Sequence, residues 1–173
     1  MSNNDQILDE FLIEAGEIFD QLDQDFVLLE KSPEDKKLIG NIFRAMHTLK
    51  GSSGFFSFRR LEKVAHAGES LLSKVRDGTR VLDAVATDLL LETLDCLRGI
   101  VKGVEQHRVE PEGDDSRLIS QLKTLTDGGT LDRPEQSSIT PPVITSTDQS
   151  RNTAVNHDEV KNDAYPDTQA QPV

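Results

Sequence analysis

A histidine and a lysine lie one helical turn apart in the first third of the chain, and small residues follow them. His47 and Lys50 are three residues apart, and Gly51-Ser52-Ser53-Gly54 comes directly afterwards. Residues at this spacing lie on the same side of a helix. A neutral imidazole is a nucleophile, and an ammonium group one turn away could offset the charge of a phosphoryl group added to it. These two residues are therefore the first candidates for chemistry.

The surroundings of His47 are basic, although the chain of 173 residues has 31 acids against 19 bases and a net charge of −12. No Asp or Glu occurs between Lys36 and Leu61. The bases of this stretch are Lys36, Lys37, Arg44, Lys50, Arg59 and Arg60. The one extended cationic stretch of an anionic chain is thus centred on His47.

The small residues after Lys50 are expected to open the surface beside the imidazole. Glycine within a helix costs about 1 kcal/mol relative to alanine, so Gly51 and Gly54 suggest a steric reason. We expect Arg44, Gly51, Ser52 and Gly54 to form the surface on which a catalytic partner docks. The alternative is that the glycines only end the helix near Gly54.

A second group of polar residues follows at helical spacing. Glu62, His66 and Glu69 are separated by four and three residues, and His66 and Glu69 adjoin an apolar stripe. If their helix packs against the helix of His47, Glu69 or His66 could accept the proton on one ring nitrogen and leave the other as the nucleophile. The alternative is a solvated polar face without a role.

Apolar residues that recur every three or four positions predict five helices. The first should begin near Asn4 or Asp5 and end before Ser32-Pro33. Ser32 is expected to cap the second helix, with Pro33 as its first residue. Its buried stripe would contain Leu38, Ile39, Ile42, Phe43, Met46 and Leu49, which leaves His47 exposed.

The remaining boundaries have their own signals. The third helix contains Leu61 to Val75 and should end at Asp77-Gly78, where glycine can adopt a left-handed conformation. Asp83 can cap the fourth, whose apolar face fades at residues 106–108, and the fifth should span about 115–126. No segment alternates with period two, so we predict an all-α, up-down antiparallel four-helix bundle with an additional short C-terminal helix.

The chain is expected to divide into a helical domain, residues 1–126, and a disordered segment, residues 127–173. All seven Phe lie at or before Phe58, while five of the seven Pro lie at or after Pro134. Such a polar segment cannot bury enough apolar surface to offset the entropy of ordering. It could be a linker within a longer protein or a natural disordered tail.

Composition and motifs exclude several classes of function. The acidic balance argues against nucleic acid as a partner, and no apolar run is long enough to insert in a membrane, so we expect a cytoplasmic protein. Cys96 is the only cysteine and is expected to be a small core residue. Neither Gly-x-x-x-x-Gly-Lys-Ser/Thr nor Gly-x-Gly-x-x-Gly occurs, so the chain should bind no cofactor or nucleotide itself. A carboxylate-bridged metal bundle would need Glu-x-x-His motifs from two helices, whereas this chain has one His66-x-x-Glu69 in reverse order.

Together these residues resemble the histidine phosphotransfer (Hpt) domain found at the N-terminus of the chemotaxis histidine kinase CheA and its relatives. The helix pattern is similar over about residues 5–126, and the specific motif lies within 43–78. The motif comprises His47-Thr48-Leu49-Lys50-Gly51-Ser52-Ser53-Gly54-Phe55-Phe56, then Phe58, Leu61, His66 and Glu69. One departure is Ser57, where family members often have glycine, so the turn at that position could differ.

The resemblance implies a phosphoryl carrier rather than an enzyme in its own right. His47 would receive the γ-phosphoryl group of ATP from the ATP-binding catalytic domain of a histidine kinase and pass it to an aspartate of a response-regulator receiver domain. Lys50, His66 and Glu69 would support the imidazole. ATP and Mg²⁺ would be bound by the kinase domain, the isolated domain would be monomeric, and the chain would be the N-terminal fragment of a longer kinase.

Two alternatives remain at this point. A free-standing Hpt protein, or the Hpt part of another sensor kinase or pilus-motility system, would share the chemistry but have other partners. A helical adaptor bundle with an incidental His47 would explain the helices, but it would explain neither the basic stretch nor the small residues.

Overall fold

The computed structural model describes residues 3–131, and within that range the chain forms helices and no strand. The helices are α1 (Asn3–Lys31), α2 (Lys36–Phe55), α3 (Arg59–Arg76), α4 (Ala84–His107) and α5 (Ser116–Thr126). The predicted all-α fold is therefore confirmed. None of these helices combines the length and the apolar character needed to cross a membrane.

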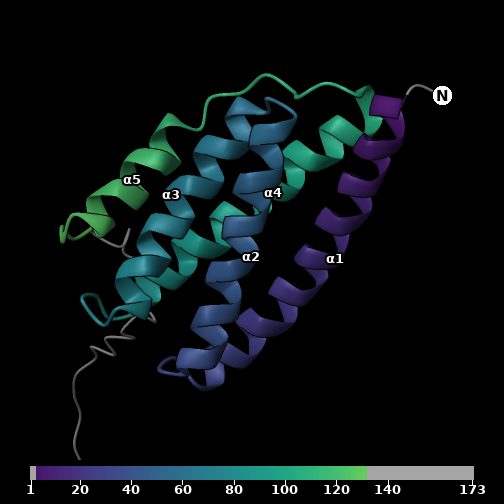
Figure 1. The fold of residues 1–173 in the computed structure, drawn as a ribbon. Helices are drawn as coiled ribbons and strands as arrows, with labels where there is room; N and C mark the ends of the chain where they lie inside the picture. Colours follow the sequence, from purple (N-terminus) through teal and green to yellow (C-terminus); the bar gives the residue numbers. More distant parts are fainter. Residues whose placement is uncertain (1–2, 132–173) are drawn as a thin grey trace, which may run out of the picture. The chain divides into compact units, whose positions relative to one another are not determined.

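The first four helices pack as a bundle, and α5 lies against its side (Figure 1). Helix α2 contacts α1 on one side and α3 on the other, α4 contacts α1 and α3, and α5 contacts α3 and α4. Each helix contributes an apolar stripe to one common core. The largest fully buried side chains are Leu22, Leu29, Ile42, Met46, Leu49, Leu61, Leu71, Leu72, Leu90, Leu94, Leu97 and Ile100.

The start of α2 differs from the expected Ser32-Pro33 boundary. The backbone N–H of Ser32 donates to the carbonyls of Leu28 and Leu29, so Ser32 belongs to the last turn of α1. The cap of α2 is Asp35, whose Oδ1 accepts from the N–H groups of Lys37 at 2.8 Å and Leu38 at 3.2 Å. The prediction of a Ser32 cap was wrong because a carboxylate closer to α2 satisfies two of its free N–H groups and also carries negative charge to the positive end of the helix dipole.

The other predicted boundaries are confirmed. Asp83 caps α4, since its Oδ1 accepts from the N–H of Ala86 at 2.8 Å. Helix α3 ends before Asp77, and Gly78 follows with a φ of 73°. Glycine reaches this left-handed conformation without the steric cost that a Cβ atom brings, so Asp77-Gly78 is an efficient stop.

Helix α5 is held to the bundle by a partly buried ion pair at its N-cap, Asp115. Arg60 donates from Nε to Asp115 Oδ2 at 2.5 Å and from Nη2 to Oδ1 at 2.8 Å. The thiol of Cys96 donates to the same carboxylate at 3.2 Å, and burial together with this hydrogen bond raises the pKa of Cys96 to about 11. Cys96 is half-buried and packs against the edge of the core, so the expected packing role is accompanied by a hydrogen bond to Asp115 that the sequence did not suggest.

Ordered structure continues past the expected boundary at residue 126. The N–H of Gly129 donates to the carbonyl of Thr124, Arg80 donates to the carbonyls of Leu125 and Gly129, and Leu131 packs against the core. The rest of the segment predicted to be disordered, residues 132–173, lies outside the described residues.

The connection between α2 and α3 passes through a strained residue. Ser57 has a φ of 59°, in the left-handed region that costs a residue with a Cβ atom about 1 kcal/mol. The turn thus keeps the conformation that glycine favours, although serine occupies it.

Replacing Ser57 with glycine should therefore stabilise the domain. We expect the free energy of unfolding to rise by about 0.5–1 kcal/mol, because the left-handed strain is relieved. Urea unfolding followed by far-UV circular dichroism measures this change. Ser120→Gly, at an exposed site inside α5, is the matched control and should destabilise instead. Equal losses of stability in both variants would show that no strain is stored at Ser57.

Candidate functional site

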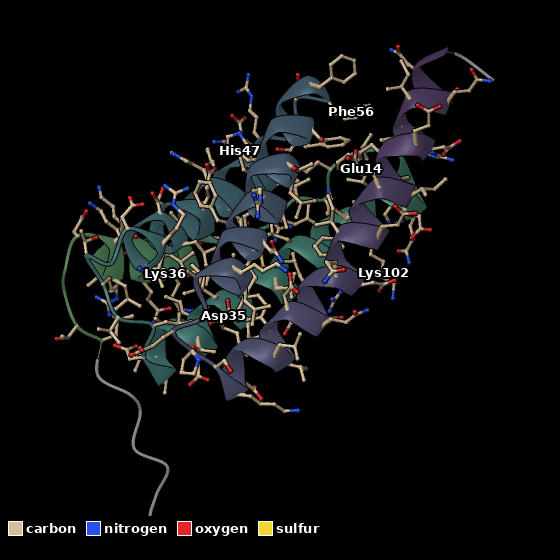
Figure 2. The ribbon with its side chains drawn as sticks, turned by 60° about the horizontal axis from the view of Figure 1, so that its bottom comes forward. Glu14, Asp35, Lys36, His47, Phe56 and Lys102 are labelled. Carbon is tan, nitrogen blue, oxygen red and sulfur yellow. The ribbon has the colours of Figure 1, made fainter. Side chains whose placement is uncertain are left out.

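His47 lies on the outer side of α2, as its helical position predicts. Its neighbours Met46 and Leu49 are fully buried, whereas the His47 side chain is 61% exposed. Figure 2 shows His47 on the α2 ribbon between Lys36 at one end of the helix and Phe56 just beyond the other. The apolar stripe of α2 therefore faces the core and presents the imidazole to solvent.

The imidazole is hydrogen-bonded to a carboxylate from the neighbouring helix. His47 Nδ1 lies 2.8 Å from Glu69 Oε1, and the Glu69 side chain is only 11% exposed. The preceding residue, Gly68, permits this approach: a Cβ atom there would lie 3.1 Å from Thr93 Cγ2 and 3.7 Å from Met46 Cε. Close packing of α3 against α2 and α4 thus brings Glu69 to His47.

Lys50 completes the site from the next turn of α2. Its Nζ lies 2.7 Å from Glu69 Oε2, and its side chain is 27% exposed. This contact is an ion pair with a largely buried carboxylate oxygen. Glu69 therefore bridges His47 and Lys50 through its two oxygens.

The charge state of Glu69 determines which nitrogen of His47 is free. Burial raises the pKa of Glu69, but the hydrogen bond to His47 and the contact with Lys50 together outweigh burial and hold that pKa below its ordinary value. An ionised carboxylate can only accept hydrogen bonds, so Nδ1 must carry the proton. In the neutral ring, Nε2 then holds the free lone pair and is the nucleophile.

His66 does not join this group, contrary to the expectation that it would support the imidazole. Its ring makes no hydrogen bond or ion pair with His47 or Glu69 in the described part of the chain, and it lines a groove with Lys63, Ala67, Ser70 and residues of α5. His66 and Glu69 are three residues apart, which leaves about 60° between them around the helix axis. That angle suffices to direct Glu69 to α2 and His66 toward α5.

The residues expected to dock a partner lie along the same exposed side of α2. Arg44 is exposed and donates from Nη2 to Asn41 Oδ1 at 3.0 Å, and Ser52 is half-buried. Helix α2 continues through Gly51 and Gly54 to Phe55, so Gly51 does not end it. A Cβ atom at either glycine would meet no atom within 4 Å. Packing inside the domain therefore does not require these two glycines, and their docking role remains a prediction.

Phe43 has a contact that sequence reasoning missed. The pattern assigned it to the buried stripe, but the side chain is half-buried and its ring stacks beside His47, with ring centroids 6.2 Å apart and an interplanar angle of 21°. The guanidinium of Arg76 lies over the Phe43 ring, 4.2 Å from its centroid. The sequence held a signal for this contact, because Phe43 and His47 are four residues apart and so lie on the same side of a helix.

No metal centre accompanies the site within residues 3–131, where no three His, Cys, Asp or Glu side chains are grouped to hold an ion. The arrangement itself is that of a nucleophile, an orienting carboxylate base and a nearby cation. It suits the covalent capture of an anionic group such as a phosphoryl group.

Comparison with known protein families identifies the family of this chain. The Hpt domain family matches residues 6–100, which is more than half of the chain. The chain belongs to the Hpt domain family. The resemblance seen in the motif around His47 is thereby confirmed, and the departure at Ser57 leaves the match intact.

Relatives of this Hpt domain include a sensor histidine kinase and chemotaxis proteins. The chain is 33% identical over 130 residues to the sensor histidine kinase CheAY of Helicobacter pylori, covering 73% of this chain and 16% of that protein. It is 34% identical over 122 residues to the chemotaxis protein CheA of Bacillus subtilis, covering 70% of this chain and 17% of that protein. The Hpt domain thus corresponds to a small part of these relatives' length.

Solved structures of chemotaxis phosphotransfer domains share the fold. The phosphorylated P1 domain of CheA3 from R. sphaeroides, solved in complex with CheY6, is 27% identical with a TM-score of 0.67 and covers 73% of this chain and 99% of its own. The CheA phosphotransferase domain from Thermotoga maritima is 31% identical with a TM-score of 0.57 and covers 61% of this chain and 99% of its own. The Hpt helical bundle is confirmed by these likenesses.

The ion pair at Glu69 should appear in the pH dependence of stability. A carboxyl whose pKa is lowered by folding contributes stability above its unfolded pKa, and that contribution disappears as the pH falls through the folded pKa. At neutral pH, Glu69→Gln should lower the free energy of unfolding by about 1–2 kcal/mol, because the ammonium of Lys50 and the N–H of His47 lose their charged acceptor but still need one. The difference from wild type should shrink below a pH of about 4.5, the ordinary pKa of the group.

Urea unfolding over a series of pH values measures this difference. Glu62→Gln, at an exposed position of the same helix, is the matched control and should follow the wild-type curve. A Glu69→Gln curve that stays parallel to wild type throughout the acid range would contradict an ionised Glu69.

Proposed function

We propose that this Hpt domain is the phosphoryl carrier of a CheA-like chemotaxis signalling system. His47 receives the γ-phosphoryl group of ATP from a histidine kinase domain and passes it to an aspartate of a response regulator. The observation that carries the proposal is the 2.8 Å contact between Nδ1 and Glu69 on an imidazole that is 61% exposed. It assigns the proton to Nδ1 and leaves Nε2 free for an incoming phosphoryl group.

In the first step, the Nε2 lone pair forms a bond to the γ-phosphorus while the bond from that phosphorus to the leaving oxygen of ADP breaks. The positive charge that develops on the ring is shared through Nδ1–H with the Glu69 carboxylate. Lys50 lies one turn away and offsets the negative charge of the attached phosphoryl group. In the second step, an aspartate oxygen of the receiver attacks phosphorus, the P–N bond breaks, and Nε2 regains its lone pair.

The division of labour between this domain and its partners follows from that chemistry. Positioning the phosphates and Mg²⁺ is the demanding part of phosphoryl transfer, and we assign it to the ATP-binding kinase domain. The basic stretch and the small residues around His47 provide access and an attractive surface for the two partners in turn. Arg44, Gly51, Ser52 and Gly54 are the docking residues in this proposal.

The partners are proposed from the relatives. The curated relatives are much longer than this chain, which supports a kinase domain elsewhere in the complete protein. The R. sphaeroides P1 domain was solved with CheY6, which supports a response regulator as acceptor. The names of the relatives favour chemotaxis over a pilus-motility system. We place the carrier in the cytoplasm and expect the isolated domain to be monomeric.

The central test is phosphorylation of the chain by a cognate kinase core with ATP and Mg²⁺. We expect an acid-labile, base-stable phosphate on His47, detected by mass spectrometry, and no labelling of His47→Gln. Labelling that persists in His47→Gln would refute the proposal.

The supporting residues have distinct expected effects on the initial rate of labelling. Lys50→Ala and Glu69→Ala should each slow it by about 10-fold or more, because each removes a charged contact at the reacting group. Lys102→Ala, on the exposed side of α4, is the matched control for Lys50 and should label at the wild-type rate. His66→Ala should also label normally, and a large loss would restore the role that the sequence suggested. Far-UV circular dichroism should be unchanged in all four variants.

A further inference from the structure

A stack of three side chains borders the site, formed by His47, Phe43 and Arg76. Phe43 lies one turn before His47 on α2, with nearly parallel rings whose centroids are 6.2 Å apart. The separation is within the range in which aromatic pairs attract one another in an offset arrangement. One flat face of the exposed imidazole is thereby restrained.

Arg76, at the end of α3, holds the phenyl ring in turn. Its Cζ lies 4.2 Å from the Phe43 centroid, a distance at which the ring quadrupole attracts a cation. Its Nε donates to Asp77 Oδ1 at 3.1 Å, so the guanidinium is itself restrained. The order of contacts is Arg76, Phe43 and His47, across two helices.

Glu69 alone does not set the direction of Nε2. A single hydrogen bond at Nδ1 holds one atom, and the ring can still pivot about the Nδ1···Oε1 contact, since the side chain is too exposed for packing to hold it. The Nε2 lone pair lies in the plane of the ring, so the plane must be fixed for the lone pair to point at an incoming phosphorus. Stacking on Phe43 supplies that second restraint.

We propose that Phe43 is a positioning residue for phosphoryl transfer and that Arg76 acts through it. The inference rests on the proposed function of His47, since it concerns the rate at which Nε2 is presented. Phe43 touches neither partner nor phosphoryl group in this scheme. It fixes the plane of the imidazole ring, which the hydrogen bond to Glu69 does not fix.

The domain contains a matched pair against which this role can be measured. Arg98 lies over the ring of Phe19, with Cζ 5.4 Å from the centroid, and pairs with Asp23. The Arg76 and Arg98 side chains are both 40% exposed, and each is ion-paired with an aspartate. The α1–α4 pair thus reproduces the chemistry of the Arg76–Phe43 pair without a histidine beside it.

The experiment compares Phe43→Leu, Phe43→Tyr, Arg76→Gln and Arg98→Gln in the chain with a cognate kinase core. Phe43→Leu should lower the labelling rate by about 3- to 10-fold, which is the rate effect expected when the interaction free energy of one aromatic pair is lost. Phe43→Tyr keeps the ring and should label at about the wild-type rate. Arg76→Gln should slow labelling by about twofold, and Arg98→Gln should leave it unchanged. Urea unfolding establishes that each variant is folded under the assay conditions.

NMR of the imidazole protons gives a readout that needs no kinase. The Hδ2 and Hε1 signals of His47 should move when Phe43→Leu removes the ring current, and Phe43→Tyr should restore them. Wild-type labelling and unmoved signals in Phe43→Leu would overturn the inference while the carrier function stands. A slow rate in Phe43→Tyr equal to that in Phe43→Leu would also overturn it, because packing rather than stacking would then matter. Labelling that survives His47→Gln would instead overturn the carrier function.

Discussion

The site depends on one buried carboxylate. Glu69 accepts from His47 through Oε1 and meets the ammonium of Lys50 at Oε2, so a single side chain of α3 fixes two residues of α2. An ionised carboxylate in a mostly buried position is costly unless its charge is paired, and here both partners carry or can gain positive charge. The same contacts therefore join two helices, favour an ionised Glu69 and leave Nε2 as the His47 nitrogen with a free lone pair.

Helix α2 meets two requirements at once. Its inner side, with Ile42, Met46 and Leu49 almost completely buried, provides part of the bundle core. Its outer side carries His47 and the two glycines that packing does not require. Because packing in the core holds α2 in place, the helix tolerates the low helix propensity of Gly51 and Gly54 on its outer side. A buried inner face thus supports an exposed imidazole.

The local features of this protein followed from local physics. Periodicity predicted the helices, Asp83 and Asp77-Gly78 marked boundaries that the structure confirms, and the position of His47 in the 3.6-residue repeat predicted its exposure. The prediction of a cap at Ser32 was wrong because Ser32 closes the last turn of α1, and Asp35 directly precedes the first residue of α2. The hydrogen bond of Cys96 was missed because its partner, Asp115, lies at the start of another helix.

The sequence by itself determined the candidate histidine, its helix and its basic neighbourhood, because spacing within one helix fixes which side chains share a face. Only the tertiary structure decided between Glu69 and His66 as the partner of the imidazole. Both adjoin the apolar stripe of α3, and the rotation of that helix is set by close packing at Gly68 against Met46 of α2 and Thr93 of α4. The stack of Arg76 on Phe43 likewise required the packing of two helices, since residues 33 positions apart have no shared local pattern.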